Sequence, residues 1–522
     1  MLFILQGCEF SAPPEKSPPV TSTTPEAVFP TPEIPVLPPA RPGQFTIRYV
    51  TDSPVNPITC MNRDNTVLSS LLYEGLFTLD SNLNVRPVLC ASWTTDDFIT
   101  YTFQIKEDIA MSDGSRLKGS DVVYTLKQAA KKGRFVNRLG IIKNVSSQEE
   151  LTVTVTLNSP NNKLIWLLDV PIIKEGSIAE SVPAGTGPYV FPASGSMRLI
   201  PFTSHRNYSR LPLTEIFLIE CHDNELAELF DDGRISLLWD DPSDTFNIIL
   251  NRQKEARFYD STALQFIGFN ARTICLADSY VRRAIGSSLN RRYIVDTIMP
   301  GQSYPAQLAL SSAYRLYDTH WEQMVVDPLK EMTYLFKYAG LEDFDNDSFL
   351  EFPDGAGGYF EIALDFIVNV ENPYKVRTAH RISDTLRLYG IEIIVRELTW
   401  DNFVNALETG AFDLYYGEIV LGADYDFSSL LLPTSRLNYG RTASTTYKQY
   451  VEAFLSAEND TDEKQAAEAL CVVIREEAPF VPILYKRYTV YTPIGAITGA
   501  APSQSGVFNN IANWSIDLNM IP

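Results

Sequence analysis

Two aspartates, Asp424 and Asp426, lie in the stretch GADYDF, directly after the apolar run FDLYYGEIVL. Carboxylates at this spacing could serve as a catalytic pair, as metal ligands, or as a fixed negative charge for a positively charged ligand group. The apolar run predicts a buried strand, so both carboxylates are expected just beyond the end of a strand. The sequence around the two aspartates has to show which of these three roles is favoured.

A second acidic stretch, DFDNDSFLEFPD, has spacings similar to those of a calcium-binding loop. Ser348 replaces the glycine of the turn, and Asp354 replaces the bidentate glutamate. A solvated surface turn is therefore favoured over a metal site, and we expect no metal and no cofactor. The weak calcium candidates are Asp343, Asp345 and Asp347, with Glu351 next in the stretch.

Other metal and catalytic signatures are missing from the sequence. His205, His222, His320 and His380 have no ligand spacing, and neither a GxSxG nor an HExxH motif occurs. The cysteines of the body form no CxxC pair and predict neither a zinc site nor a disulfide framework; they are Cys60, Cys90, Cys221, Cys275 and Cys471. The sequence therefore predicts a protein that is not an enzyme.

Length and charge narrow the class of protein further. A chain of 522 residues with 45% hydrophobic content can form several cores, roughly three at about 150 residues per domain. The net charge of −21 argues against nucleic-acid binding, which needs clustered Lys and Arg. Beyond the N-terminus no apolar run approaches the length of about 20 residues that spans a bilayer.

The N-terminal 43 residues differ in composition from the rest of the chain. Residues 1–8, MLFILQGC, are apolar and end in Cys8, and residues 9–43 are rich in Pro, Ser and Thr, which predicts a disordered tether. LQGC is similar to a bacterial lipobox, although Gln6 is not the usual small residue and the basic region of a signal peptide is missing. We expect a truncated signal segment and a lipid anchor on Cys8.

The folded part begins near Gln44 with alternating strand patterns such as TYTFQI and ELTVTVTL. A different organisation follows after about Gly268, where strands alternate with amphipathic helices. That alternation predicts a parallel sheet with right-handed crossovers and thus an α/β fold. The strands are expected at 359–368, 391–398 and 412–420, and the helices at 374–390 and 400–410.

Several segments occur in the order typical of one family: NTVLSSLLYEGLFTLDSNLNVRPVLCASW, TYTFQIKEDIAMSDGSRLKGSDVVYTL, PAGTGPYVF, FIGFNARTICLADSYVRRAIGSSLNRRYIV and EEAPFVPILY. Together they make the chain resemble the family 5 extracellular solute-binding proteins, the peptide receptors of ABC importers. The resemblance implies a two-lobed α/β periplasmic-binding-protein-like fold of type II, with an extra domain inserted in the first lobe and a ligand cleft between the lobes.

The same resemblance predicts the domain boundaries. The first lobe would comprise residues 44–268, with the inserted domain at about 58–170, and residues 488–522 would return to it. Residues 269–487 would form the second lobe. The chain would cross the hinge near Gly268 and again near Tyr488.

The resemblance also implies a peptide ligand whose α-ammonium group is bound by a buried aspartate, for which Asp424 is the matching residue. Trp400 matches a tryptophan that lines a side-chain pocket. Ala423, Tyr425 and Met61 complete the expected ligand contacts. Leu421 and Phe427 depart from the family pattern beside the aspartate, so they are where individual specificity is expected.

Partners and location follow from the same comparison. We expect delivery of the peptide to ABC permease subunits by a monomer that is anchored through its N-terminal lipid on the outer face of the cell membrane, or on the periplasmic side where an outer membrane exists. The alternatives are another cargo, such as a nickel complex, haem or a sugar, or a surface sensing protein without transport. A carboxylate enzyme using Asp424 and Asp426 is the remaining hypothesis.

Overall fold

The computed structural model describes residues 42–241, 248–324, 328–442 and 444–521. The chain divides into two compact units, Met1–Pro39 and Ala40–Pro522, and only the second is described below. Cys8 and most of the predicted tether lie outside the described residues. In the part of the chain that is described, no helix has the length and apolar character needed to cross a membrane.

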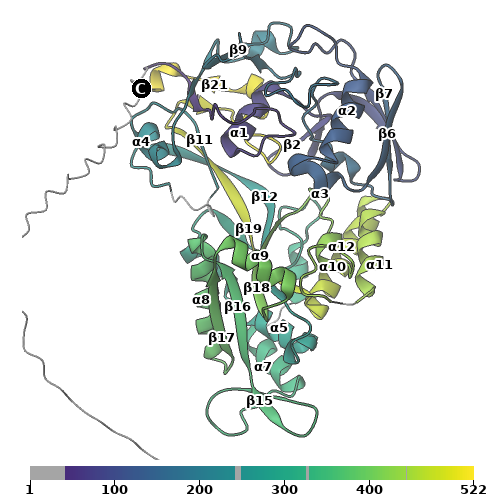
Figure 1. The fold of residues 1–522 in the computed structure, drawn as a ribbon, viewed down its shortest axis with the longest axis vertical. Coiled ribbons are helices and arrows are strands. Elements are labelled where there is room, and N and C mark those ends of the chain that lie inside the picture. Colours follow the sequence, from purple (N-terminus) through teal and green to yellow (C-terminus); the bar gives the residue numbers. More distant parts are fainter. Residues whose placement is uncertain (1–41, 242–247, 325–327, 443, 522) are drawn as a thin grey trace, which may run out of the picture. The chain divides into compact units, whose positions relative to one another are not determined.

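The first lobe contains two four-stranded sheets (Figure 1). One follows the order β1-β10-β9-β8, and the other is an antiparallel sheet of order β4-β5-β7-β6. Alternation in TVTVTL buries every second side chain of β7, as predicted from the sequence. The strands are β1 (Thr46–Arg48), β4 (Cys90–Thr94), β5 (Thr100–Ile105), β6 (Ile142–Glu149), β7 (Thr152–Leu157), β8 (Tyr189–Val190), β9 (Arg198–Pro201) and β10 (Ile216–Ile219).

The second lobe contains the predicted parallel strands, because β16 (Ala363–Asn369) pairs in parallel with β17 (Glu392–Leu398) and with β18 (Leu414–Val420). The crossover helices are α8 (Pro373–Arg387) and α9 (Trp400–Thr409). The Asn372 side chain caps α8, and Gly410 ends α9 in the left-handed conformation that favours glycine. The sequence therefore predicted this part of the fold closely.

Two long antiparallel strands, β12 (Lys254–Phe269) and β19 (Phe480–Pro493), pass from one lobe into the other (Figure 1). Residues 254–260 of β12 pair with the part of β19 that also pairs with β11 (Leu238–Asp240). Residues 264–268 of β12 still pair with β19 on one side and pair with β18 on the other. The register between β12 and β19 shifts between Asp260 and Leu264. The predicted two-lobed fold is confirmed, whereas the lobe boundaries at 268 and 488 stay predictions.

The remaining elements complete the three hydrophobic cores. All five cysteines of the body are buried as free thiols. The remaining strands are β2 (Phe77–Leu79), β3 (Val85–Pro87), β13 (Ser303–Pro305), β14 (Glu351–Pro353), β15 (Tyr359–Glu361), β20 (Ile497–Thr498) and β21 (Ser515–Ile516). The remaining helices are α1 (Arg63–Leu72), α2 (Gly119–Ala129), α3 (Val136–Leu139), α4 (Leu226–Asp231), α5 (Ser279–Ser287), α6 (Arg291–Tyr293), α7 (Pro328–Tyr338), α10 (Ser428–Leu431), α11 (Thr446–Leu455) and α12 (Asp460–Glu477).

Candidate functional site

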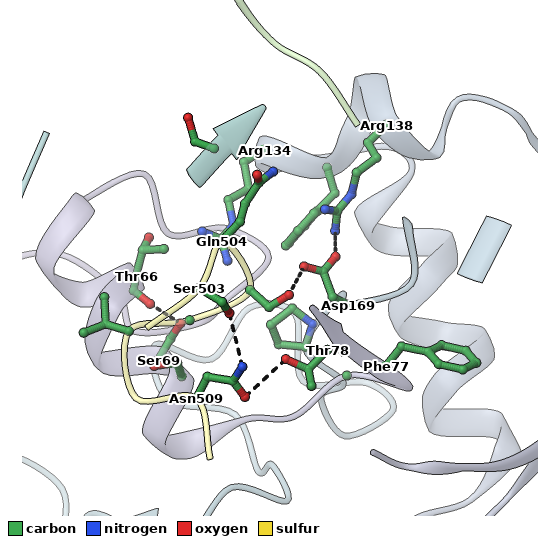
Figure 2. A pocket seen from close by; sticks show the side chains of 18 of the residues that line it. Thr66, Ser69, Phe77, Thr78, Arg134, Arg138, Asp169, Ser503, Gln504 and Asn509 are labelled. Atoms are coloured by element: carbon green, nitrogen blue, oxygen red, sulfur yellow. Dashed lines mark hydrogen bonds and ion pairs between the residues drawn. The ribbon is translucent and has the colours of Figure 1, made fainter. Parts of the chain in front are cut away.

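A cavity of about 1530 Å³ is lined by residues of both lobes. Its walls come from segments within 60–88, 134–141 and 205–211 of the first lobe and within 418–439 of the second. The C-terminal segment 501–512 also lines it, beside the first-lobe residues Thr78 and Asp169 (Figure 2). Its volume exceeds the 300 to 1,000 Å³ that is usual for small-molecule pockets, so it has room for a ligand with several variable groups and water.

Asp424 lies in a tight turn at the end of β18. The Leu421 amide and carbonyl both bond to Thr262 of β12, which fixes the point where the chain leaves the sheet. The Tyr425 amide then donates to the Gly422 carbonyl over 3.0 Å, and Tyr425 takes a positive φ of 55°. This turn directs the Asp424 carboxylate to the cavity wall, which includes Asp424 but not its neighbours Ala423 and Tyr425.

The Asp424 carboxylate is only 2% exposed, and no cation lies within 4.0 Å of it among the described residues. Asn161 donates to one oxygen over 3.1 Å, and the Asp426 amide approaches the other at 3.4 Å. Burial, and after it the negative charge of Asp426, raises the pKa of Asp424 to about 6, although the hydrogen bonds from Asn161 and the Asp426 amide and the charge of Lys163 act in the opposite direction. A positively charged ligand group would find here a buried, directed and uncompensated carboxylate.

Asp426 has a different role in the same turn. One of its oxygens accepts from the Ser428 amide over 2.8 Å, at the start of α10. This is a local side chain to backbone bond of the turn before α10, whose N-cap residue is Phe427. Asp426 also lines the cavity, beside Asp424.

Residues Asn161–Lys163, which follow β7, bring the first lobe into contact with the second lobe next to Asp424. The Asn162 amide donates to the Leu455 carbonyl over 2.7 Å, and Lys163 donates to the Phe454 carbonyl over 2.6 Å. Lys163 also lies 3.6 Å from Glu463, and burial lowers its pKa to about 8. The turn with Asp424 is therefore held from both lobes.

A buried ion-pair network forms another part of the site. Lys486 of β19 contacts Glu418 of β18 at 2.8 Å and Asp241, which follows β11, at 3.0 Å. Lys375 approaches the second oxygen of Glu418 at 2.9 Å. The nearby lysines hold the pKa of Glu418 well below its usual range despite burial. This network ties the strands of both lobes together at the cavity, which Glu418 lines.

The remaining predicted ligand contacts differ in whether they line the cavity. Met61 lines the cavity and is 78% exposed. Trp400 is 54% exposed at the start of α9, packs on Phe403 with a centroid distance of 6.1 Å, and is not one of the residues that line the cavity. Tyr425 is buried in a core and packs against Tyr314. Asp424 and Met61 are thus the predicted residues that share the cavity.

The acidic loop brings four carboxylates together, since one oxygen each of Asp343, Asp345, Asp347 and Glu351 lies within 4.8 Å of the others. The two oxygens of Asp343 accept from the amides of Asp347 and Ser348 over 3.1 and 3.0 Å. This bonding is typical of a polar surface turn. The preference for such a turn over a calcium site stays a prediction.

Other residues of the cavity had no signal in the sequence. Arg134 and Arg138 line it from the first lobe, and Arg436 lines it from the second. Isolated arginines match no motif, so only their position in the fold distinguishes them. The spacing of four between Arg134 and Arg138 could at most have indicated that they share one side of a helical turn.

The two-lobed fold, with a large cavity between its lobes, defines a ligand-binding receptor of the periplasmic-binding-protein type. A family model described as "Bacterial extracellular solute-binding proteins, family 5 Middle" matches residues 84–439. The chain therefore belongs to the family 5 bacterial extracellular solute-binding proteins. This confirms the resemblance found in the sequence.

Solved structures support the same fold. The unliganded open form of MppA, a periplasmic murein tripeptide binding protein, superposes with a TM-score of 0.73 at 16% identity, covering 91% of this chain and 98% of that one. The oligopeptide-binding protein AppA from Bacillus subtilis, in complex with a nonapeptide, gives 0.63 at 20% identity, covering 92% and 100%. At these identities the similarity concerns the fold.

A curated relative is the glutathione-binding protein GsiB of Escherichia coli (strain K12), which is 25% identical over 286 residues. The alignment covers 51% of this chain and 56% of GsiB. The chain thus matches just over half the length of this relative.

Proposed function

We propose that the protein is an extracytoplasmic receptor that captures short peptides in its interlobe cavity and delivers them to the permease of an ABC importer. The observation that carries this proposal is the Asp424 carboxylate, which is buried at the cavity wall without a cationic partner among the described residues. The α-ammonium group is the positive charge that every unmodified peptide carries. Binding it would compensate a charge that is costly to bury alone.

The size of the cavity and the ligands of similar proteins support a peptide as the cargo. A tripeptide, a nonapeptide and glutathione are named for MppA, AppA and GsiB. Other proteins of this fold are described with Fe(III)-EDTA or Ni(L-His), so a metal complex is the cargo that the experiment has to exclude. In this proposal Cys8 carries the lipid that anchors a monomeric receptor to the membrane.

Calorimetry with Ala-Ala-Ala and N-acetyl-Ala-Ala-Ala tests the proposal. We expect stoichiometric binding of the free-amine peptide and at least about hundredfold weaker binding of the acetylated one, because the acetyl group removes the charge that Asp424 binds. Chromatography of the sample after the titration should return the peptide intact. Cleaved peptide would instead favour the carboxylate enzyme, and equal binding of both peptides would contradict the role of Asp424.

Affinity for the free-amine peptide should depend on pH. Because the pKa of Asp424 is raised to about 6, its carboxylate is charged at pH 8 and becomes protonated as the pH falls through 6. Below that value the affinity should fall by up to about tenfold per pH unit. Titrations between pH 8 and pH 5 measure this dependence, and an unchanged affinity at pH 5 would count against a charged Asp424 as the anchor.

A further inference from the structure

Asn161 is a polar residue of the first lobe whose side chain reaches the second lobe. It is 2% exposed, and its carboxamide nitrogen donates to Oδ2 of Asp424 over 3.1 Å. Burying a carboxamide is costly unless its hydrogen bonds are made. Asn161 does not itself line the cavity, so any effect it has on a ligand is exerted through Asp424.

The first lobe fixes Asn161 through three hydrogen bonds. Its amide donates to the Phe98 carbonyl over 2.9 Å, and its carbonyl accepts from the Tyr101 hydroxyl over 2.7 Å. Its carboxamide oxygen accepts from the Lys163 amide over 2.8 Å. That last bond needs the oxygen on the side of Lys163, so the nitrogen is the end of the carboxamide that faces Asp424.

The two residues after Asn161 fix the same segment to the second lobe. The Asn162 side chain donates to the Ala457 carbonyl, in addition to the backbone bond described above. The Lys163 ammonium group lies 3.9 Å from the centroid of the Phe454 ring. Asn161 is therefore held against both lobes, and its side chain presents a fixed donor to the carboxylate.

The other oxygen of Asp424 has a different environment. A Cβ atom at Gly422 would lie 2.3 Å from Oδ1 of Asp424 and 2.9 Å from the Leu167 side chain, so the carboxylate occupies space that only glycine leaves open. Oδ1 has the long contact of 3.4 Å with the Asp426 amide. A carboxylate oxygen can accept about two hydrogen bonds, so Oδ1 keeps the capacity to accept from a ligand.

The charge of Asp424 depends on the groups that face it. Burial and the charge of Asp426, in the same turn, raise its pKa. Among the effects that lower this pKa, the hydrogen bond from Asn161 is the largest, ahead of the Asp426 amide and the charge of Lys163. Lys163 in turn lies 3.6 Å from Glu463 of α12, which draws on its positive charge. Asn161 is thus the main group that favours the ionised form of Asp424.

We infer that Asn161 is a positioning residue of the ammonium anchor: from the first lobe, its carboxamide keeps the Asp424 carboxylate ionised and fixed at the cavity wall. This inference rests on the proposed function, in which Asp424 binds the α-ammonium group of the peptide. Because Asn161 holds Oδ2, Oδ1 is the oxygen left for the ammonium group. The anchor is therefore built from both lobes.

Carbon-13 NMR of the ligand-free full chain, labelled at its aspartate carboxyl groups, measures the effect directly. The Asp424 signal is the one that is absent from Asp424→Asn. In the parent it should titrate near pH 6. In Asn161→Ser the midpoint should rise by about one pH unit, because the carboxylate loses a hydrogen bond that favours its charge. Serine is too short to reach Asp424, yet its hydroxyl can accept from the Lys163 amide.

Two further variants make this titration specific. Asn162→Ser is the matched control, because it makes the same change at the next residue and removes a contact with the second lobe other than the one with Asp424. Its Asp424 midpoint should equal that of the parent. Asn161→Asp keeps the size of the side chain and carries the test if the serine variant does not fold. Two adjoining carboxylates retain a proton to higher pH, so its midpoint should rise further.

Calorimetry with Ala-Ala-Ala between pH 7.5 and pH 5 connects the titration to binding. The loss of affinity in Asn161→Ser, relative to the parent, should grow by up to about tenfold as the pH falls through this range, since the variant carboxylate is protonated first. Lys163, whose pKa burial lowers to about 8, stays mainly charged in this range. A merely structural role of Asn161 would weaken binding equally at every pH.

The outcomes separate this inference from the proposed function. An Asp424 midpoint that stays at the parent value in both Asn161 variants would overturn the positioning role and leave the ammonium anchor in place. A loss of affinity in Asn161→Ser that is constant with pH would do the same. Equal binding of Ala-Ala-Ala and N-acetyl-Ala-Ala-Ala by the parent would overturn the anchor itself, and with it the role of Asn161 in binding.

Discussion

Replacing Asp424 with asparagine is expected to weaken binding of a free-amine tripeptide by at least about hundredfold. The peptide ammonium would be buried without a countercharge, which typically costs about 3 to 5 kcal/mol. Asparagine has the same shape and keeps an oxygen for the bond from Asn161. Calorimetry at pH 7.5 with Ala-Ala-Ala measures the loss.

The same variant should not lose stability. A carboxylate whose pKa is raised by burial disfavours the folded state at neutral pH, and asparagine removes that charge. Urea unfolding should therefore give an unfolding free energy at least equal to that of the parent. Asp426→Asn provides the comparison, since the Asp426 carboxylate accepts a local hydrogen bond from the Ser428 amide. A greater loss of affinity for Asp426→Asn than for Asp424→Asn would show that the anchor is assigned to the wrong aspartate.

Replacing Lys486 with methionine is expected to lower the free energy of unfolding by about 3 to 5 kcal/mol. Lys486 is 2% exposed and compensates Glu418 and Asp241 together. Removing one partner of a buried ion pair leaves the other charges uncompensated, and that accounts for the large cost. Urea unfolding followed by tryptophan fluorescence measures it.

An exposed ion pair provides the control for Lys486. Lys448 lies 3.5 Å from Glu452 on the surface of α11, and both are well exposed, so Lys448→Met should change stability by less than about 1 kcal/mol. Adding Glu418→Gln to Lys486→Met should restore part of the loss, because it removes one of the uncompensated charges. A loss below about 1 kcal/mol for Lys486→Met would contradict a network that holds β18 and β19 together.

The parallel part of the fold could be predicted because each element carries its own pattern. Apolar residues in WDNFVNALETG have helical spacing, and Phe403, Ala406 and Leu407 are the buried face of α9. The same packing explains why the Trp400 side chain is exposed, because Trp400 begins α9 on the face that points away from the core. The ligand contact that the family resemblance implies for Trp400 stays a prediction.

For Asp424, the sequence predicted the position after a strand but not the residues that contact its carboxylate. The apolar run before it indicated the strand, and the position beyond the strand end followed from that. The contact with Asn161 joins residues 263 positions apart, and no local pattern contains such a contact. Arg134 and Arg436 are similar cases, because only the folded chain brings them to the cavity wall.

Mass spectrometry of the small molecules released on denaturing the purified protein tests the central claim most directly. The account predicts short peptides with a free amine, present in the parent and depleted in Asp424→Asn. A non-peptide cargo released equally by the parent and by Asp424→Asn, such as a metal chelate, would contradict it.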